Sequence, residues 1–195
     1  KVLGEGGNLG MTQLSRVEYA LNGGRCNTDF IDNAGGVDCS DHEVNIKILL
    51  NTVIENGDMT SKQRNVLLET MTDSVSELVL ENNYKQAQAL SLAERESLLR
   101  TGEYRRLIQS MEASGRLNRQ LEFIPDDDVL LERKNSGKGL TRPELSVLIS
   151  YTKSQLKEEL VESAVPDDAY MLHAVESAFP SKLREEFNQN IHHHR

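Results

Sequence analysis

Tryptophan is absent from the sequence, and aromatic residues make up only 5% of its 195 residues. The tyrosines, among them Tyr84, Tyr104 and Tyr151, are scattered and form no platform on which nucleic-acid bases could stack. The two cysteines, Cys26 and Cys39, are too few for a disulfide framework. A reduced, cytoplasmic setting is therefore expected.

Long apolar runs and an excess of positive charge are also missing. No run approaches the length that spans a membrane, and no signal peptide opens the chain. The 22 basic residues are outnumbered by 31 acidic ones, which gives a formal net charge of −9. Without a basic stripe to neutralise phosphates, neither nucleic acid nor a membrane is expected as a partner.

The composition that remains is that of an ordinary globular protein, with 37% hydrophobic and 27% charged residues. The sequence has no initiating methionine, and its end falls inside the amphipathic pattern Leu183, Phe187, Ile191. Both ends are expected to be cut, so the chain is interpreted as a fragment of a longer protein.

Two glycine-asparagine turns lie in the first part of the chain. The first is Gly4–Asn8 (GEGGN), and a pattern with helical spacing follows it from Thr12 to Leu21. The second is Asn33–Val37 (NAGGV), and the S-x-x-E spacing of Ser40–Glu43 predicts a capping box just after it. The helix that starts there is expected to end at Gly57.

Such turns can bind ligands because of their geometry. Glycine lets the backbone turn sharply and a ligand come close, and a following helix N-terminus offers free N–H groups and a positive dipole end. In parallel α/β sheets, ligands lie at the carboxyl ends of strands, where such turns occur. The alternative is that these are ordinary turn residues, since Leu9 stands where a G-x-G-x-x-G fingerprint needs its third glycine.

The residues of both turns resemble those of a known enzyme family. Gly4–Asn8 is similar to the E-G-A-N turn of glutamate dehydrogenases, with Gly7 where the family usually has alanine. Asn33–Ser40 resembles their N-A-G-G-V-x-x-S segment. Three further segments resemble the large bacterial NAD-specific branch of that family: Arg25–Asp29 (RCNTD), Asp41–Lys47 (DHEVNIK) and Leu140–Leu145 (LTRPEL).

The resemblance implies an enzyme that transfers hydride between L-glutamate and NAD and forms 2-oxoglutarate and ammonia. By the family pattern, Asn8 would contact the ribose or nicotinamide side of NAD, and Asn33 would hydrogen-bond its carboxamide. Gly35 and Gly36 would belong to the same cofactor-binding segment, and Ser40 would bind the side-chain carboxylate of glutamate. From the residues alone, the two asparagines could simply hold turns and the serine could cap a helix.

The family's catalytic lysine and aspartate, and its glycine-rich pyrophosphate loop, would lie before Lys1. No residue of this chain is therefore assigned to proton transfer, and the isolated chain is expected to be inactive. A homo-oligomer is expected for the full-length enzyme, and no metal site is predicted. Two alternatives stay open: a dehydrogenase of branched-chain amino acids, against which the polar Ser40 argues, and a helical packing or assembly module without chemistry.

Before Gly57, the short apolar run Val2–Leu3 is the signal for a strand. Beyond Gly57 such signals are absent, and the apolar residues recur at helical spacing. The spacings Thr60-x-x-Gln63 and Thr141-x-x-Glu144 predict helix starts. The predicted fold class is therefore mostly α, with a remnant of an α/β dinucleotide-binding (Rossmann-like) domain followed by an α-helical C-terminal domain. The predicted domains are the C-terminal part of the dinucleotide-binding catalytic domain (1–57) and a truncated helical domain (58–195).

Overall fold

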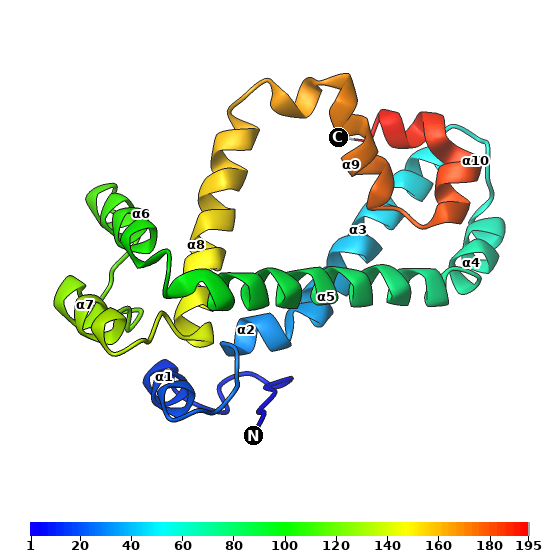
Figure 1. The fold of residues 1–195 in the computed structure, drawn as a ribbon. Coiled ribbons are helices and arrows are strands. Elements are labelled where there is room, and N and C mark those ends of the chain that lie inside the picture. Colours follow the sequence, from blue (N-terminus) through cyan, green and yellow to red (C-terminus); the bar gives the residue numbers. More distant parts are fainter. Residues whose placement is uncertain (195) are drawn as a thin grey trace. The chain divides into compact units, whose positions relative to one another are not determined.

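The computed structural model describes residues 1–194, and helices account for most of them (Figure 1). This confirms the expected mostly helical class. Two short 3-10 helices, Val165–Asp167 and Ala169–Met171, precede α9. The α-helices in chain order are α1 (Gln13–Leu21), α2 (Asp29–Asp32), α3 (Ala34–Glu55), α4 (Ser61–Glu69), α5 (Thr72–Ser97), α6 (Thr101–Ala113), α7 (Asp127–Asn135), α8 (Arg142–Val161), α9 (Leu172–Ser177) and α10 (Ser181–His192).

Across residues 1–194, β-structure is limited to one isolated parallel bridge between Val2 and Arg25. The N–H of Leu3 donates to the carbonyl of Arg25 at 2.8 Å, and the N–H of Arg25 donates to the carbonyl of Lys1 at 3.0 Å. A single bridge does not make a sheet. The structure thus supports the helical class without showing a Rossmann-like remnant.

Local interactions define several helix boundaries, and those at Thr60 and Gly57 lie where the sequence predicted them. Thr12 caps α1 by accepting a hydrogen bond from the N–H of Ser15, and Thr60 forms the predicted capping box with Gln63 at the start of α4. Gly57 adopts a φ of +83° just after α3. Its N–H donates to Ile54, and the next N–H donates back to Val53, which is the Schellman arrangement that ends a helix.

The predicted start of α3 is wrong. The helix begins at Ala34, directly after Asn33, so Gly35, Gly36 and Ser40 lie in its first two turns. Ser40 is therefore no helix cap, and its hydroxyl donates to the carbonyl of Gly36 at 3.2 Å inside the helix. Packing explains the earlier start: a Cβ on Gly35 would already lie within 4 Å of side chains of α5, and tertiary contact outweighs the poor helix propensity of glycine.

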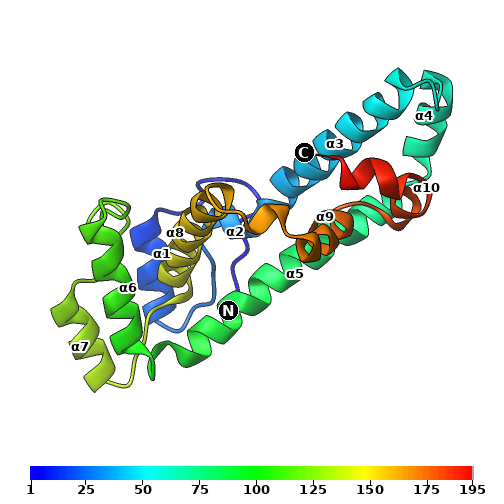
Figure 2. The ribbon, with the colours of Figure 1, turned by 90° about the horizontal axis from the view of Figure 1, so that it is seen from above.

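The chain forms two compact units, and each has its own hydrophobic core. The first unit comprises residues 1–33 and 85–159. It contains α1, α2, α6 and α7 entirely, and Figures 1 and 2 show α6 and α7 lying side by side. The largest fully buried side chains of its core are Leu90, Ile108, Met111, Leu130, Leu145 and Leu148.

The second unit comprises residues 34–84 and the chain from residue 160 onward. In it α10 packs against α9 and α3. His42 of α3 is buried, and its Nδ1 lies 2.8 Å from the carbonyl oxygen of Ala178. The buried residues of its core are Ile46, Leu49, Leu50, Leu67, Met71, Phe179, Leu183 and Ile191.

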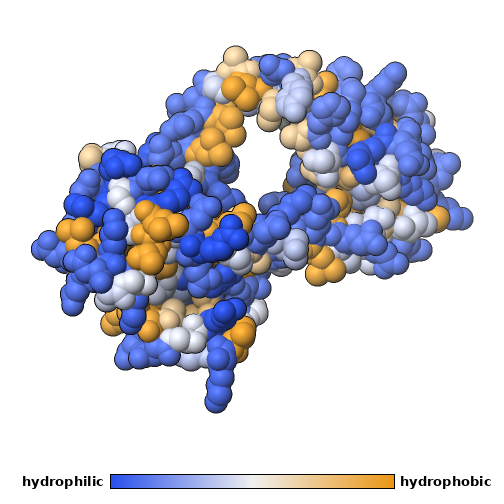
Figure 3. Space-filling view, viewed as in Figure 1, coloured by the Kyte–Doolittle hydropathy of each residue, from blue (hydrophilic) through white to orange (hydrophobic). Residues whose placement is uncertain are grey.

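Polar side chains cover most of the surface seen in Figure 3, and apolar side chains reach the surface in each unit. On α3 the exposed apolar side chains are Val37, Val44 and Ile48. Among residues 1–194, no helix is both long enough and apolar enough to cross a lipid bilayer.

The helix α8 begins at a completely buried carboxylate. The Oε2 atom of Glu144 accepts hydrogen bonds from the N–H of Thr141 at 2.7 Å and from its hydroxyl at 2.8 Å. Nη1 of Arg133, on α7, donates to both carboxylate oxygens at 2.8 and 2.9 Å. These contacts confirm the helix start predicted from the Thr141-x-x-Glu144 spacing.

A second buried ion pair holds the turn before α1, residues 4–11, which we call the Asn8 turn. Arg16 donates from Nε to Oε2 of Glu5 at 2.5 Å and from Nη2 to Oε1 at 3.1 Å. The same Oε1 accepts from the N–H of Met11 at 2.9 Å. A Cβ at Gly10 would lie 2.8 Å from this oxygen, so the glycine leaves room for the carboxylate.

Loss of the Glu144 carboxylate should destabilise α8 strongly. The Glu144→Ala variant leaves the Arg133 guanidinium and the Thr141 N–H without their acceptor, and breaking a buried pair costs about 3–5 kcal/mol. Hydrogen exchange of the α8 amides will measure the loss. Glu158→Ala is the control on the same helix, because its ion pair with Arg116 is exposed and should contribute less than about 1 kcal/mol. Equal loss of protection in the two variants would contradict this prediction.

The Asn8 turn should become less stable in acid. The hydrogen bonds from Arg16 hold the pKa of the Glu5 carboxyl below its ordinary value of 4.5. Its stabilising contribution is therefore fully present above pH 4.5 and is lost as the pH falls through the lower pKa of the folded state. Urea unfolding across this range should show a smaller pH dependence for Glu5→Gln than for the unmodified chain. Glu18→Gln, an exposed change on α1, should leave the dependence as it is.

Candidate functional site

The Asn8 turn is held by carboxylates of the short helix α2. The N–H of Glu5 donates to Oδ2 of Asp32 at 2.9 Å, and the N–H of Leu9 donates to Oδ2 of Asp29 at 3.0 Å. Leu9 adopts a φ of +63°, in the left-handed region. The amide of Asn8 is exposed and makes no hydrogen bond within residues 1–194, so its donor and acceptor groups are available to a ligand.

Asn33 directly follows the same small helix, α2. It forms the C-cap of α2, and its backbone N–H donates to the carbonyl of Asp29 at 3.0 Å. Its side-chain amide also makes no hydrogen bond among the described residues, 1–194. Because Asp29 and Asp32 tie the Asn8 turn to α2, two of the predicted cofactor-binding residues belong to one hydrogen-bonded substructure of the first unit.

The other predicted residues belong to the second unit. A Cβ at Gly35 would lie 3.5 Å from Nδ2 of Asn83 and 3.7 Å from Cγ1 of Val79, so this glycine packs against α5. Gly36 has open space where a Cβ would be. Ser40 is exposed, and its hydroxyl can turn toward a ligand in exchange for its bond inside the helix.

Asp38 and His42, two polar residues of α3 close to Gly35 and Gly36, were not predicted from the sequence as part of this region. Asp38 accepts from Nδ2 of Asn82 through both carboxylate oxygens, at 3.2 and 3.0 Å. Nε2 of the buried His42 lies 3.9 Å from Oδ1 of Asp38 and has no hydrogen-bond partner within residues 1–194. The i, i+4 spacing of the aspartate and the histidine could have indicated their proximity once the helix was known to start at Ala34.

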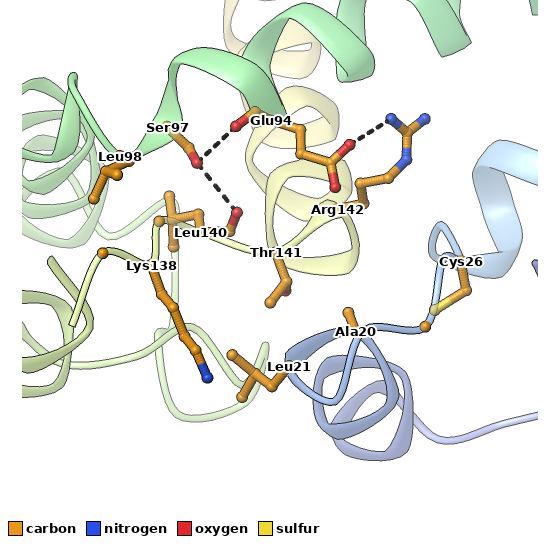
Figure 4. Close-up of a pocket in the computed structure, with 14 residues that line it drawn as sticks. Ala20, Leu21, Cys26, Glu94, Ser97, Leu98, Lys138, Leu140, Thr141 and Arg142 are labelled. Atoms are coloured by element: carbon orange, nitrogen blue, oxygen red, sulfur yellow. Dashed lines mark hydrogen bonds and ion pairs between the residues drawn. The ribbon is translucent and has the colours of Figure 1, made fainter. Parts of the chain in front are cut away.

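A longer chain of hydrogen bonds reaches the Asn8 turn from α8. Oδ1 of Asp32 accepts from Nδ2 of Asn27 at 2.7 Å, and Oδ1 of Asn27 accepts from Nε of Arg142 at 2.9 Å. Nη1 of Arg142 donates in turn to Glu94 of α5 at 3.1 Å (Figure 4). No local sequence signal marks this arrangement, because Asn27 and Arg142 are 115 residues apart.

A cavity of about 370 Å³ lies beside Arg142 in the first unit (Figure 4). It is bounded by the ends of α1 and α5 and by the segment before α8, and none of the five predicted site residues lines it. Gly139 lets that segment approach α5 closely, since a Cβ there would lie 2.1 Å from Oγ of Ser97. Burial raises the pKa of the lining thiol of Cys26, which keeps it protonated and unreactive.

The charged groups of the described residues do not form a metal centre. Among residues 1–194, no group of three or more His, Cys, Asp or Glu side chains is arranged to hold a metal ion. Asp127, one of three consecutive aspartates, is bound by Arg105 at 2.8 Å and Arg119 at 3.0 Å. These arginines hold the pKa of Asp127 below its ordinary value, with Arg105 the largest cause.

Comparison with known proteins was made over the whole chain. Residues 1–93 match the family model for the bacterial NAD-glutamate dehydrogenase catalytic domain, and residues 137–195 match the model for the glutamate dehydrogenase C-terminal region. The NAD-specific glutamate dehydrogenase of Pseudomonas aeruginosa is 64% identical over all 195 residues, and that of Halomonas elongata is 58% identical over the same length. That of Mycobacterium tuberculosis is 42% identical over 194 residues.

These relatives are much longer than the chain, which covers 12% of the length of each. The match to the Pseudomonas aeruginosa protein covers the whole chain, and an identity of 64% over 195 residues far exceeds what the two turns could supply. The chain belongs to the family of the large bacterial NAD-specific glutamate dehydrogenases.

Proposed function

We propose that the chain is part of an NAD-dependent enzyme that oxidatively deaminates L-glutamate to 2-oxoglutarate and ammonia. The observation that carries this proposal is the identity of 64% over the whole chain to a protein named NAD-specific glutamate dehydrogenase. The same name recurs in the other two relatives. It favours glutamate over a branched-chain amino acid as the substrate.

The two asparagines supply the contacts to the cofactor. When bound, NAD accepts the hydride that leaves the α-carbon of the substrate. The free amides of Asn8 and Asn33 fit this group, because each offers a donor and an acceptor to a ribose hydroxyl or a carboxamide. Gly36 has open space where a side chain would be, so a ligand can approach the backbone at the start of α3 there, whereas Gly35 faces α5 and would contribute its place in the cofactor-binding segment. Asp29 and Asp32 position Asn8 by holding the backbone of its turn.

Ser40 supplies the contact to the substrate. Its hydroxyl, now bonded to the carbonyl of Gly36, would donate instead to the side-chain carboxylate of glutamate. Three features support this role: the side chain is exposed, it has no capping function, and it lies two helical turns or fewer from Gly35 and Gly36.

The domain organisation proposed for the parent enzyme follows the same assignment. Residues 1–57 form the end of a dinucleotide-binding, Rossmann-like catalytic domain, and residues 58–195 form a helical C-terminal domain. The parallel bridge between Val2 and Arg25 supports the α/β origin of the first part. The match to the catalytic-domain model extends to residue 93, so α4 and most of α5 also lie in the part that matches that domain. A cytoplasmic homo-oligomer is proposed for the full-length enzyme.

The isolated chain should not catalyse the reaction. None of its residues is assigned to the proton transfers that accompany oxidation of an amine, and part of the cofactor site belongs to the parent enzyme. The purified chain, mixed with L-glutamate and NAD, should show no increase in NADH absorbance. Turnover that persists after removal of contaminating enzyme would overturn the assignment of the proton-transfer groups to the rest of the parent enzyme.

Replacement of Ser40 in the full-length enzyme should affect glutamate and not NAD. The Ser40→Ala variant removes a charge-assisted bond worth roughly 1.5–3 kcal/mol, so kcat/KM for glutamate should fall about tenfold to a hundredfold. Because the side chain is exposed and caps nothing, the stability should change by less than about 0.5 kcal/mol. Steady-state kinetics and thermal melts will measure the two effects.

The matched control for Ser40 is Ser76→Ala. Ser76 is also an exposed helical serine whose hydroxyl donates to the carbonyl four residues earlier, at 3.0 Å. It should leave both kinetics and stability unchanged. Equal kinetics for the two variants would remove Ser40 from the substrate site.

A further inference from the structure

The first turn of α8 binds the segment that lies between the two motif turns. Arg142 donates from Nε to Asn27, as described above. The carbonyl of Pro143 accepts from the hydroxyl of Thr28 at 3.0 Å and from Nε2 of Gln13 at 3.1 Å. The N–H of Thr28 lies 3.4 Å from Oγ of Ser146. Four contacts from one helix start therefore hold Asn27, Thr28 and α1.

These contacts join two regions of the chain that match different family models. Residues 27 and 28 lie in the region that matches the catalytic domain, and residues 142–146 lie in the region that matches the C-terminal model. Both regions meet inside the first compact unit, where Thr28 and Ser146 are buried. The C-terminal region is thus in direct contact with the part of the catalytic domain that carries the Asn8 turn.

Arg142 is suited to this junction by its shape. Its side chain is 14% exposed, and its Nε and Nη1 atoms donate to Asn27 and Glu94 respectively. Nη1 also donates to Oγ of Ser91 at 3.0 Å. The planar guanidinium carries donors in a fixed arrangement on separate nitrogens and so holds partners on two segments in a defined geometry, which the single ammonium group of lysine does not reproduce.

We infer that Arg142 is a positioning residue for the cofactor-binding turn of this enzyme, and this inference rests on the proposed function of Asn8. The route has three bonds: Arg142 orients the amide of Asn27, this amide donates to Asp32, and Asp32 accepts from the N–H of Glu5 in the Asn8 turn. Arg142 itself touches neither cofactor nor substrate. Its role is to hold the turn in the geometry that binds NAD.

The test uses the full-length enzyme with Arg142→Gln and, as a matched control, Arg100→Gln. Like Arg142, Arg100 forms an ion pair with a glutamate, in its case with both Glu96 and Glu103, but it is half-exposed and makes no contact with the turn among residues 1–194. We expect the KM for NAD to rise about tenfold or more in Arg142→Gln, since small misplacement of a binding group is costly. The KM for glutamate should change far less, and the control should keep both values.

A merely structural role of Arg142 predicts a different result. In that case the melting temperature falls while the KM for NAD stays at its original value. The variant Arg142→Lys separates the roles, because it keeps a positive charge beside Glu94 but cannot also bond Asn27 in the same way. If only the charge of Arg142 matters, Arg142→Lys should restore the melting temperature. If Arg142 positions the turn, the raised KM for NAD should persist in Arg142→Lys.

The middle bond of the route has its own test. Asn27→Asp keeps an oxygen acceptor for Arg142 but removes the amide that donates to Asp32. It should raise the KM for NAD as Arg142→Gln does, and the double variant should be no worse than the more affected single one, because both changes break one route. Additive effects would overturn the inference.

The variant Asn8→Ala distinguishes failure of this inference from failure of the proposed function. If Asn8→Ala raises the KM for NAD and Arg142→Gln does not, the route from α8 is wrong and the cofactor-binding turn stands. If Asn8→Ala leaves the KM for NAD unchanged, the turn itself has been wrongly assigned to the cofactor, and the positioning role of Arg142 falls with it.

Discussion

The buried carboxylate of Glu144 is the contact on which much of the first unit depends. It satisfies the N–H of Thr141 and the guanidinium of Arg133, and so it determines where α8 starts. That start determines the positions of Arg142 and Pro143, which hold the chain at residues 27 and 28. A carboxylate can be buried without a large penalty only when its oxygens are fully bonded, as they are here.

Carboxylates that accept hydrogen bonds also hold the backbone of the Asn8 turn. Glu5, Asp29 and Asp32 all accept hydrogen bonds from backbone N–H groups of the turn, and Arg16 balances two of the three carboxylates. A turn rich in glycine has little side-chain packing of its own, so it needs such bonds to adopt a single conformation. Its order therefore comes from Glu5 of the turn itself and from charged side chains of α1 and α2, and not from an apolar core.

Features decided within a few residues could be predicted from the sequence. The helix starts at Thr60 and Thr141 and the terminating Gly57 act on the adjacent turn of backbone, and all three lie where they were expected. The start of α3 could not be predicted, because contact with α5 and not a local cap decides it. The candidate site divides similarly. Motif resemblance predicts Asn8, Asn33 and Ser40 as site residues, whereas the bond between Asn27 and Arg142 depends on tertiary structure and could not be predicted.

Gly10 illustrates a different kind of constraint on a turn for which ligand binding is proposed. A glycine in such a turn is usually explained by the space that the ligand needs, but the space at Gly10 is filled by an oxygen of Glu5. This oxygen is held by Arg16 and by the N–H of Met11, so it cannot easily move aside for a methyl group. The missing side chain at Gly10 therefore serves the internal structure of the Asn8 turn, and it would be needed there whether or not the turn binds a ligand.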